Sequence, residues 1–207
     1  MSNRLFVGVL EIGRAMSTPR IYVAILADYN SGHLTGEWVD VPDTVEELQE
    51  EIARILRGSK YPNVLVDCPD CAGDDTAPPR MSECTTCKGT GKVPSAEEWA
   101  IHDYELEGIK ISEHEDLETI VLHGKMLAEH DGAWAAYVEW GKGDPTEDDF
   151  QECYRGTWRT LADWAEEYLS DCGDLKPDSL LANYFDYERF ARDCEMGGDI
   201  YSCSGGS

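Results

Sequence analysis

The stretch IYVAILADYNSGHLTGEWVDV, residues 21–41, decides the fold that the sequence predicts. Residues 21–27 are rich in β-branched and aromatic side chains, which are typical of a β-strand. Residues 28–36 are rich in Asp, Asn and Gly and predict a turn. Residues 37–41 alternate apolar and charged side chains. The stretch therefore predicts two strands at the start of a folded domain.

A helix is predicted next, because Thr44 and Glu47 fit a capping box and apolar residues recur at helical spacing up to Gly58. Residues 98–105, EWAIHDYE, predict a third strand. Together these elements predict a small α+β domain over residues 18–106, with an insertion at 64–93.

The rest of the chain predicts mainly helices. Apolar residues between Leu117 and Leu127 and the run GAWAAYVEW (132–140) give an acidic helical central domain, residues 107–144. The C-terminal α/β domain, residues 145–207, is expected to hold helices over 148–154, 157–171 and the stretch after 183, then a short strand.

The sequence of the N-terminal segment does not fit the pattern of the domain that follows it. Met16 looks like a natural start, so we expect residues 1–17 to be a disordered extension. The apolar run LFVGVL (5–10) follows a single Arg4 and is too weak for a signal peptide, and no stretch is long enough to cross a membrane. We therefore expect a cytoplasmic protein whose eight Cys do not form a disulfide framework.

The charge balance is the unusual feature of the composition. Forty-two acidic residues face 17 basic ones, which gives a formal net charge of -25. Residues 97–152 hold 17 acidic and three basic residues, a balance of -14. Such a field repels nucleic acids and anionic membranes and attracts cationic surfaces. Solubility or a halophilic source are the simpler explanations, but the missing Lys partners along the helices favour a functional field.

Two C-x-x-C pairs, Cys68-Pro-Asp-Cys71 and Cys84-Thr-Thr-Cys87, have the spacing of a structural zinc site with four thiolates. Gly73, Gly89 and Gly91 follow the pairs, where tight knuckles need positive φ. A closed four-thiolate site leaves no open position for catalysis, and we expect one zinc ion that supports folding. A redox pair or free thiols are the alternatives. The doubled pattern over residues 68–91 is similar to half of the zinc region of DnaJ-type chaperones.

Four separated stretches resemble ArdA antirestriction proteins in the right order. They are TPRIYVAILADYNSGHLTGEWVD (18–40), EEWAIHDYE (97–105), the antirestriction motif LADWAEEYLSDC (161–172) and YFDYERFARDCEMGGDI (184–200). The cysteine insertion is a departure from the family pattern, and the given chain stops at SGGS where a further short strand is expected.

The resemblance implies an α+β protein: an elongated chain of three small α/β domains, here with a zinc-knuckle insertion. It also implies a homodimer that mimics bent B-form DNA and has no catalytic residues. Its partner would be a Type I restriction-modification complex, bound through the specificity and methyltransferase subunits. Nucleic acid and membranes are not expected as partners.

The candidate site residues fall into two further groups. We expect the DNA-mimic carboxylates in the acidic middle of the chain: Glu105, Glu107, Glu113, Glu115, Asp116, Glu118, Glu129, Asp131, Asp144, Glu147, Asp148 and Asp149. The motif helix carries an apolar stripe, which packs on the core or on a dimer partner, and acids outside that stripe: Leu161, Asp163, Trp164, Ala165, Glu166, Glu167, Tyr168 and Leu169.

Two other functions compete with mimicry. A zinc-knuckle adaptor or co-chaperone would lose partner binding with its zinc, and neutralising acids would not affect it. A metal-supported enzyme would need a nucleophile or an open metal position, and none is recognisable; His102 beside Asp103 lacks a Ser or Cys in a recognisable turn. A metal site from His114, His123 and His130 is a weaker alternative.

Overall fold

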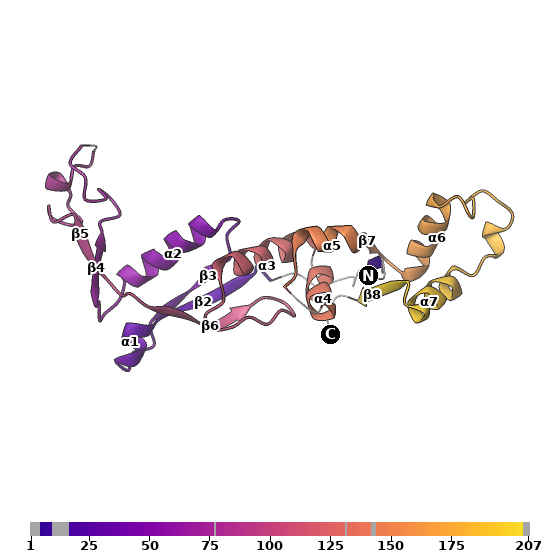
Figure 1. The fold of residues 1–207 in the computed structure, drawn as a ribbon, viewed down its shortest axis with the longest axis horizontal. Coiled ribbons are helices and arrows are strands. Elements are labelled where there is room, and N and C mark those ends of the chain that lie inside the picture. Colours follow the sequence, from indigo (N-terminus) through magenta and orange to yellow (C-terminus); the bar gives the residue numbers. More distant parts are fainter. Residues whose placement is uncertain (1–4, 10–16, 77, 131, 142–143, 205–207) are drawn as a thin grey trace. The chain divides into compact units, whose positions relative to one another are not determined.

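The computed structural model describes residues 5–9, 17–76, 78–130, 132–141 and 144–204 (Figure 1). Its contacts divide the chain into two compact units. The N-terminal unit comprises residues 18–105 and 111–124, and the C-terminal unit comprises residues 1–17, 106–110 and 125–207. Both units combine helices and strands, which confirms the predicted α+β class.

The N-terminal unit contains the three predicted strands in one antiparallel sheet. β2 (Arg20–Ile25) lies between β3 (Gly36–Asp40) and β6 (Trp99–Glu105), and Ile21 is opposite both Val39 and Tyr104. The first strand ends at Ile25, two residues earlier than predicted, because the short helix α1 (Leu26–Asn30) begins at Leu26.

Helix α2 (Val45–Arg57) covers this sheet as predicted. The Thr44 hydroxyl accepts a hydrogen bond from the Glu47 amide at 3.3 Å, and Gly58 is the C-cap. Leu48 and Ile52 are buried in the same core as strand residues such as Ile21. A long apolar face on a capped helix therefore was sufficient to predict this element.

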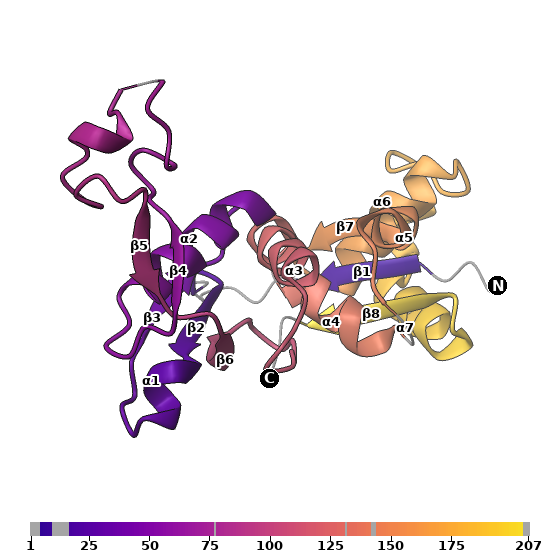
Figure 2. The same cartoon turned by 60° about the vertical axis from the view of Figure 1, so that its left-hand side comes forward.

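The inserted segment forms a two-stranded ribbon, β4 (Val64–Asp67) and β5 (Lys92–Ser95), with a 3-10 turn, η1 (Met81–Glu83), between the strands (Figure 2). We call residues 64–95 the cysteine module. The ribbon is anchored at the C-terminal end of α2, where the Ala96 amide donates to the Leu56 carbonyl at 3.0 Å.

The predicted central domain is not a separate unit. Helix α3 (Leu117–His130) contributes Ile120 and Val121 to the N-terminal core, whereas residues from Lys125 onward, including α4 (Gly132–Trp140), belong to the C-terminal unit. The contacts thus divide the chain into two units, and residues 107–144 are shared between them.

The C-terminal unit is built on a parallel sheet with the order β7-β1-β8. Its strands are β1 (Leu5–Val9), β7 (Tyr154–Trp158) and β8 (Ile200–Ser204). On one face Phe6 contacts aromatic rings of α4 and of α5 (Glu147–Cys153). On the other face Val7 packs with α6 (Leu161–Asp171) and α7 (Tyr187–Gly197), which are joined through η2 (Ala182–Tyr184).

The prediction of a disordered N-terminal extension is wrong for Leu5–Val9. Phe6 and Val7 are fully buried in the centre of the sheet, and residues 1–4 and 10–16 lie outside the described residues. The prediction of a helix from residue 157 also needs correction, because Thr157 and Trp158 belong to β7 and the helix begins only after the Thr160 cap.

Candidate functional site

The acidic residues expected to carry the function are mostly on the surface. Eight of the twelve candidates are exposed: Glu105, Glu113, Asp116, Glu118, Glu129, Asp144, Asp148 and Asp149. Three are half-buried, namely Glu107, Glu115 and Glu147, and Asp131 lies outside the described residues. The charge of the central segment is therefore presented largely to solvent.

Some of these carboxylates have a basic partner: Glu105 and Glu147 are paired with an Arg and a Lys, and Glu113 and Glu129 lie within 3.7 and 3.9 Å of a His side chain. Arg20 on β2 donates to both carboxylate oxygens of Glu105 on β6 at 2.8 Å, and this pairing lowers the pKa of Glu105. Glu147 accepts from Lys125 at 2.8 Å. The partner of Glu105 lies 85 residues away in the sequence, so no local pattern could reveal it.

Other candidates also have local structural roles. The Asp116 carboxylate accepts from the Thr119 amide at 2.8 Å and from its hydroxyl at 2.7 Å at the start of α3, and these bonds lower the pKa of Asp116. Asp149 accepts from the Thr146 hydroxyl at 2.7 Å at the start of α5. Such bonds leave the negative charge in place while they fix the carboxylate, as a positioned phosphate mimic requires.

The motif helix α6 uses its apolar stripe within its own unit. Trp164, Ala165 and Leu169 are buried, and the first two pack against Val7 and Ala191. The buried part of the stripe thus packs within the C-terminal unit. Tyr168 is 38% exposed and stacks on Trp164. The remaining motif residues are exposed acids, Glu166 and Glu167, and half-buried Leu161 and Asp163.

The four predicted ligand cysteines come together in the cysteine module. Cys68, Cys71, Cys84 and Cys87 are all buried, and their sulfurs lie within 4.8 Å of one another. The Cys68–Cys84 and Cys71–Cys87 sulfurs are both 3.7 Å apart. Zinc–sulfur bonds of about 2.3 Å place tetrahedral sulfurs roughly 3.8 Å apart. The four cysteines can therefore hold a metal ion.

The two halves of the module share one backbone conformation. After each C-x-x-C pair comes a left-handed residue, Ala72 (φ 48°) or Lys88 (φ 54°), and then a glycine with positive φ, Gly73 or Gly89. The Thr86 hydroxyl donates to the Asp70 carboxylate and connects the two turns. Gly91 has a φ of 70°, so the predicted need for glycine at all three positions is confirmed.

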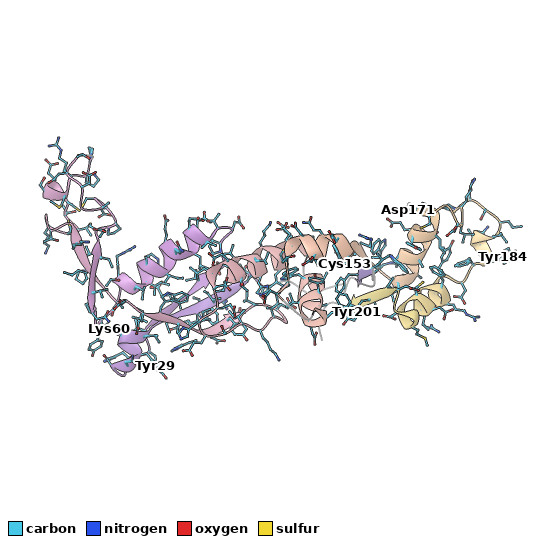
Figure 3. All side chains as sticks on the ribbon, in the orientation of Figure 1. Tyr29, Lys60, Cys153, Asp171, Tyr184 and Tyr201 are labelled. Atoms are coloured by element: carbon cyan, nitrogen blue, oxygen red, sulfur yellow. The ribbon has the colours of Figure 1, made fainter. Side chains whose placement is uncertain are left out.

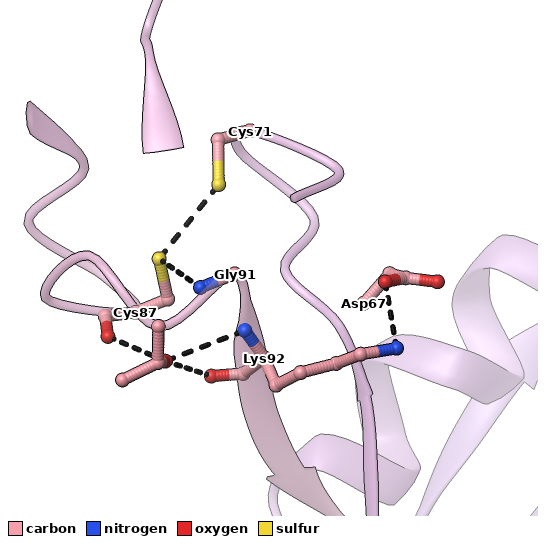
Figure 4. Close-up of polar contacts among 6 residues, drawn as sticks. Asp67, Cys71, Cys87, Gly91 and Lys92 are labelled. Atoms are coloured by element: carbon pink, nitrogen blue, oxygen red, sulfur yellow. Dashed lines mark hydrogen bonds and ion pairs between the residues drawn. The ribbon is translucent and has the colours of Figure 1, made fainter. Parts of the chain in front are cut away.

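Backbone amides prepare the module for negatively charged sulfur. The Gly91 amide donates to the Cys87 sulfur at 3.3 Å (Figure 4). Burial raises the pKa of the Cys87 thiol, but hydrogen bonds with the Gly91 and Gly89 amides and with the Cys71 and Cys84 side chains together outweigh burial and bring that pKa to about 7. Burial raises the pKa of Cys71 to about 12. Since all four sulfurs lie within 4.8 Å of one another and all four cysteines are free, the geometry suits metal coordination better than a redox pair.

A buried carboxylate that the sequence did not reveal holds the segment leading into the module. Asp28 is fully buried at the end of β2, where α1 begins, and accepts from the Ser59 hydroxyl and from the Lys60 and Tyr61 amides, both at 3.1 Å. Figure 3 labels Lys60, one of these donors, and Tyr29, which follows Asp28 in the sequence. Burial raises the pKa of Asp28, but these hydrogen bonds outweigh burial and hold it below its ordinary value.

The histidines do not assemble into a second centre. Among the described residues, the four cysteines are the only group of ligand atoms close enough to hold a metal ion. His123 is buried, and burial lowers its pKa. Nor does any helix in the described parts of the chain have the length and apolar composition needed to cross a membrane.

Comparison with known protein families gives a match over most of the chain. Residues 21–207 match the family model described as "Antirestriction protein (ArdA)". The matched range includes the cysteine module and begins after β1. No curated protein matches the chain in sequence.

Proposed function

The chain belongs to the ArdA antirestriction family, and from this membership we propose that it inhibits Type I restriction-modification enzymes by occupying their DNA-binding groove. The observation that carries the proposal is the balance of -14 over residues 97–152, together with the exposure of most candidate carboxylates in that segment. The specificity and methyltransferase subunits, whose groove binds phosphates with Arg and Lys, are the expected contacts.

The mechanism is electrostatic and involves no bond making. Exposed carboxylates take the place of phosphate oxygens as acceptors for Arg and Lys, and no base edges are offered. Inhibition is therefore indifferent to the recognition sequence of the target. Since the restriction complex meets DNA in the cytoplasm, we place the inhibitor there as well, and its own field keeps it from binding nucleic acid.

We further propose that the active form is a homodimer. Two chains at -25 give a formal charge of -50, which equals that of roughly 85 Å of duplex at about one charge per 1.7 Å. Exposed apolar side chains near α6 support a contact surface in the C-terminal unit: Leu180, Leu181 and Tyr184 are 73%, 71% and 82% exposed (Figure 3). Exposed groups of this kind are typical of protein contacts.

The metal that we propose for the cysteine module is a single zinc ion with a structural role. Cys68, Cys71, Cys84 and Cys87 would complete a closed tetrahedron, and the ion would supply the folding energy that the module lacks. Among the described residues, the hydrophobic cluster of the module contains Val93, Val66 and Met81 besides the cysteines.

Competition tests the proposal directly. The protein and a DNA duplex should compete for a purified Type I methyltransferase, and the inhibitor's affinity should fall with salt, as DNA affinity falls by roughly 10³–10⁵-fold between 50 and 200 mM for six to ten phosphate contacts. Binding that leaves bound DNA in place, or that ignores salt, contradicts mimicry. If zinc removal abolishes binding and salt does not, the module acts as an adaptor.

A further inference from the structure

Strand β1 stands out because it completes the C-terminal sheet from the far end of the sequence. β7 and β8 each pair with β1 and not with each other, so the sheet has the order β7-β1-β8. Residues Leu5 to Val9 pair one by one with Ile200 to Ser204, and Phe6 is opposite Tyr154 on the other side. The central position of the sheet is thus a slot, with a pairing edge on each side, for one strand.

Side chains of β1 fill both faces of this slot. Phe6 is fully buried; its ring stacks on Tyr201 with centroids 5.4 Å apart and meets Tyr137 edge-on at 5.9 Å. Val7, also fully buried, belongs to the cluster of Trp164, Ala165, Ala191 and Ile200. The slot therefore recognises an apolar strand by its side chains as well as by its backbone.

Gly8 makes the fit selective. A Cβ atom on Gly8 would lie 2.7 Å from the Thr157 hydroxyl oxygen and 3.3 Å from the Gly156 carbonyl oxygen. Any larger residue at this position must displace the Thr157 side chain on β7. The sequence Phe-Val-Gly therefore matches the slot position by position.

β1 is separated in the sequence from β7 and β8, its partners in the C-terminal unit, by residues 18–105, which belong to the N-terminal unit. No turn joins β1 directly to β7 or β8, so backbone pairing and side-chain packing hold it in the slot. The same contacts are available to an identical segment of another molecule.

We propose that the slot between β7 and β8 is a strand-binding site that accepts Leu5–Val9 of a second copy in place of the chain's own segment. Reciprocal exchange then joins two chains without any new contact surface, since every pairing and packing interaction is the one already formed within one chain. This inference does not rest on the proposed inhibition of restriction enzymes.

The test begins with the full chain carrying a protease site between residues 12 and 13. After cleavage, the fragment should stay bound through gel filtration, and an excess of labelled peptide of residues 2–15 should replace it, as fluorescence anisotropy reports. A tagged uncut chain should also copurify with the cleaved chain. The proposal fails if the cleaved protein loses its fragment and then does not bind the added peptide. It also requires that the peptide restore the fold of a cleaved protein that has lost its fragment, which circular dichroism would show.

A matched pair of substitutions controls for nonspecific binding. A Gly8→Ala peptide should bind the cleaved protein about tenfold more weakly or worse, because overpacking is costly. A Thr157→Ala substitution in the slot removes the closest atom and should restore much of that loss. Equal binding of both peptides to the unchanged slot contradicts the proposed fit.

Discussion

The cysteine module and the acidic central segment are neighbours in the sequence but depend on their residues in opposite ways. In the module, four sulfurs share one small volume and together can hold a metal ion. In the acidic segment, exposed carboxylates are spread over several elements of both units. We therefore expect a single substitution to abolish metal binding by the cysteine module. In the acidic segment, many charges must be removed together before inhibition is lost.

The largest single-residue effect is expected in the module. Replacing one ligand, Cys84→Ser, opens the tetrahedron, and because structural zinc contributes about 10–16 kcal/mol we expect the ion and the module fold to be lost together. Elemental analysis and limited proteolysis of residues 64–95 measure both. Cys172→Ser, at an exposed cysteine outside the cluster, is the control. Full zinc content in the Cys84 variant would contradict the four-thiolate site.

Asp28 differs from the acids of the central segment, because its carboxylate is buried and has fixed hydrogen-bond donors. Asp28→Ala leaves the Lys60 and Tyr61 amides without their acceptor, and we expect a loss of about 3 kcal/mol in unfolding free energy. Chemical denaturation measures it, with Asp28→Asn as the milder change. An Asp28→Ala protein as stable as the parent would show that the network contributes nothing.

The same residue predicts a pH dependence. Since the pKa of Asp28 is lowered in the folded protein, its stabilisation is present above the unfolded value of about 3.9 and is lost as the pH falls through the folded value. Unfolding free energy should therefore drop more steeply below pH 4 for the parent than for Asp28→Asn.

A smaller effect is expected at Gly91. Gly91→Ala places a Cβ 2.8 Å from the Met81 sulfur on a backbone with φ of 70°, which costs about 1–2 kcal/mol in left-handed strain alone. Competition for zinc with a chromophoric chelator measures the weakened site. Gly32→Ala, with φ of 83° and open space around it, gives strain without crowding. An unchanged zinc affinity for Gly91→Ala would contradict the close packing.

The smallest effect is expected for one exposed acid. Glu118→Gln removes one charge from a distributed field, and target affinity should change by about threefold or less. A competition binding curve measures it. If this one substitution abolished inhibition, Glu118 would be a specific contact, and the contrast with the module would disappear.

Local patterns in the sequence predicted the elements that depend on local physics. Helix α2 has its Thr44 cap, its apolar face and its terminal glycine within one short stretch. The cysteine cluster likewise follows from two pairs of spacings, because each knuckle is a local structure. The family resemblance, which extends across most of the chain, is confirmed by the match over residues 21–207.

Long-range pairing could not be predicted in the same way. β1 and β7 are short, and each is stable only because the other lies beside it, nearly 150 positions away in the sequence. For the same reason the Arg20–Glu105 pair and the hydrogen-bond donors around Asp28 have no local signal. These missed features join residues that are distant in sequence.

The most direct test of mimicry compares two variants with equal net charge. One neutralises six acids of the central segment, Glu113, Glu115, Glu118, Glu129, Asp144 and Asp148, and the other neutralises six acids elsewhere, Asp43, Glu46, Glu50, Asp174, Asp178 and Glu188. Each changes the formal charge from -25 to -19. We predict that the central variant loses about 100-fold or more in affinity for the Type I methyltransferase, since each missing charge removes one released counterion. The other variant should stay close to the parent. Equal losses in both variants would show that total charge matters and its position does not, and this would contradict the account.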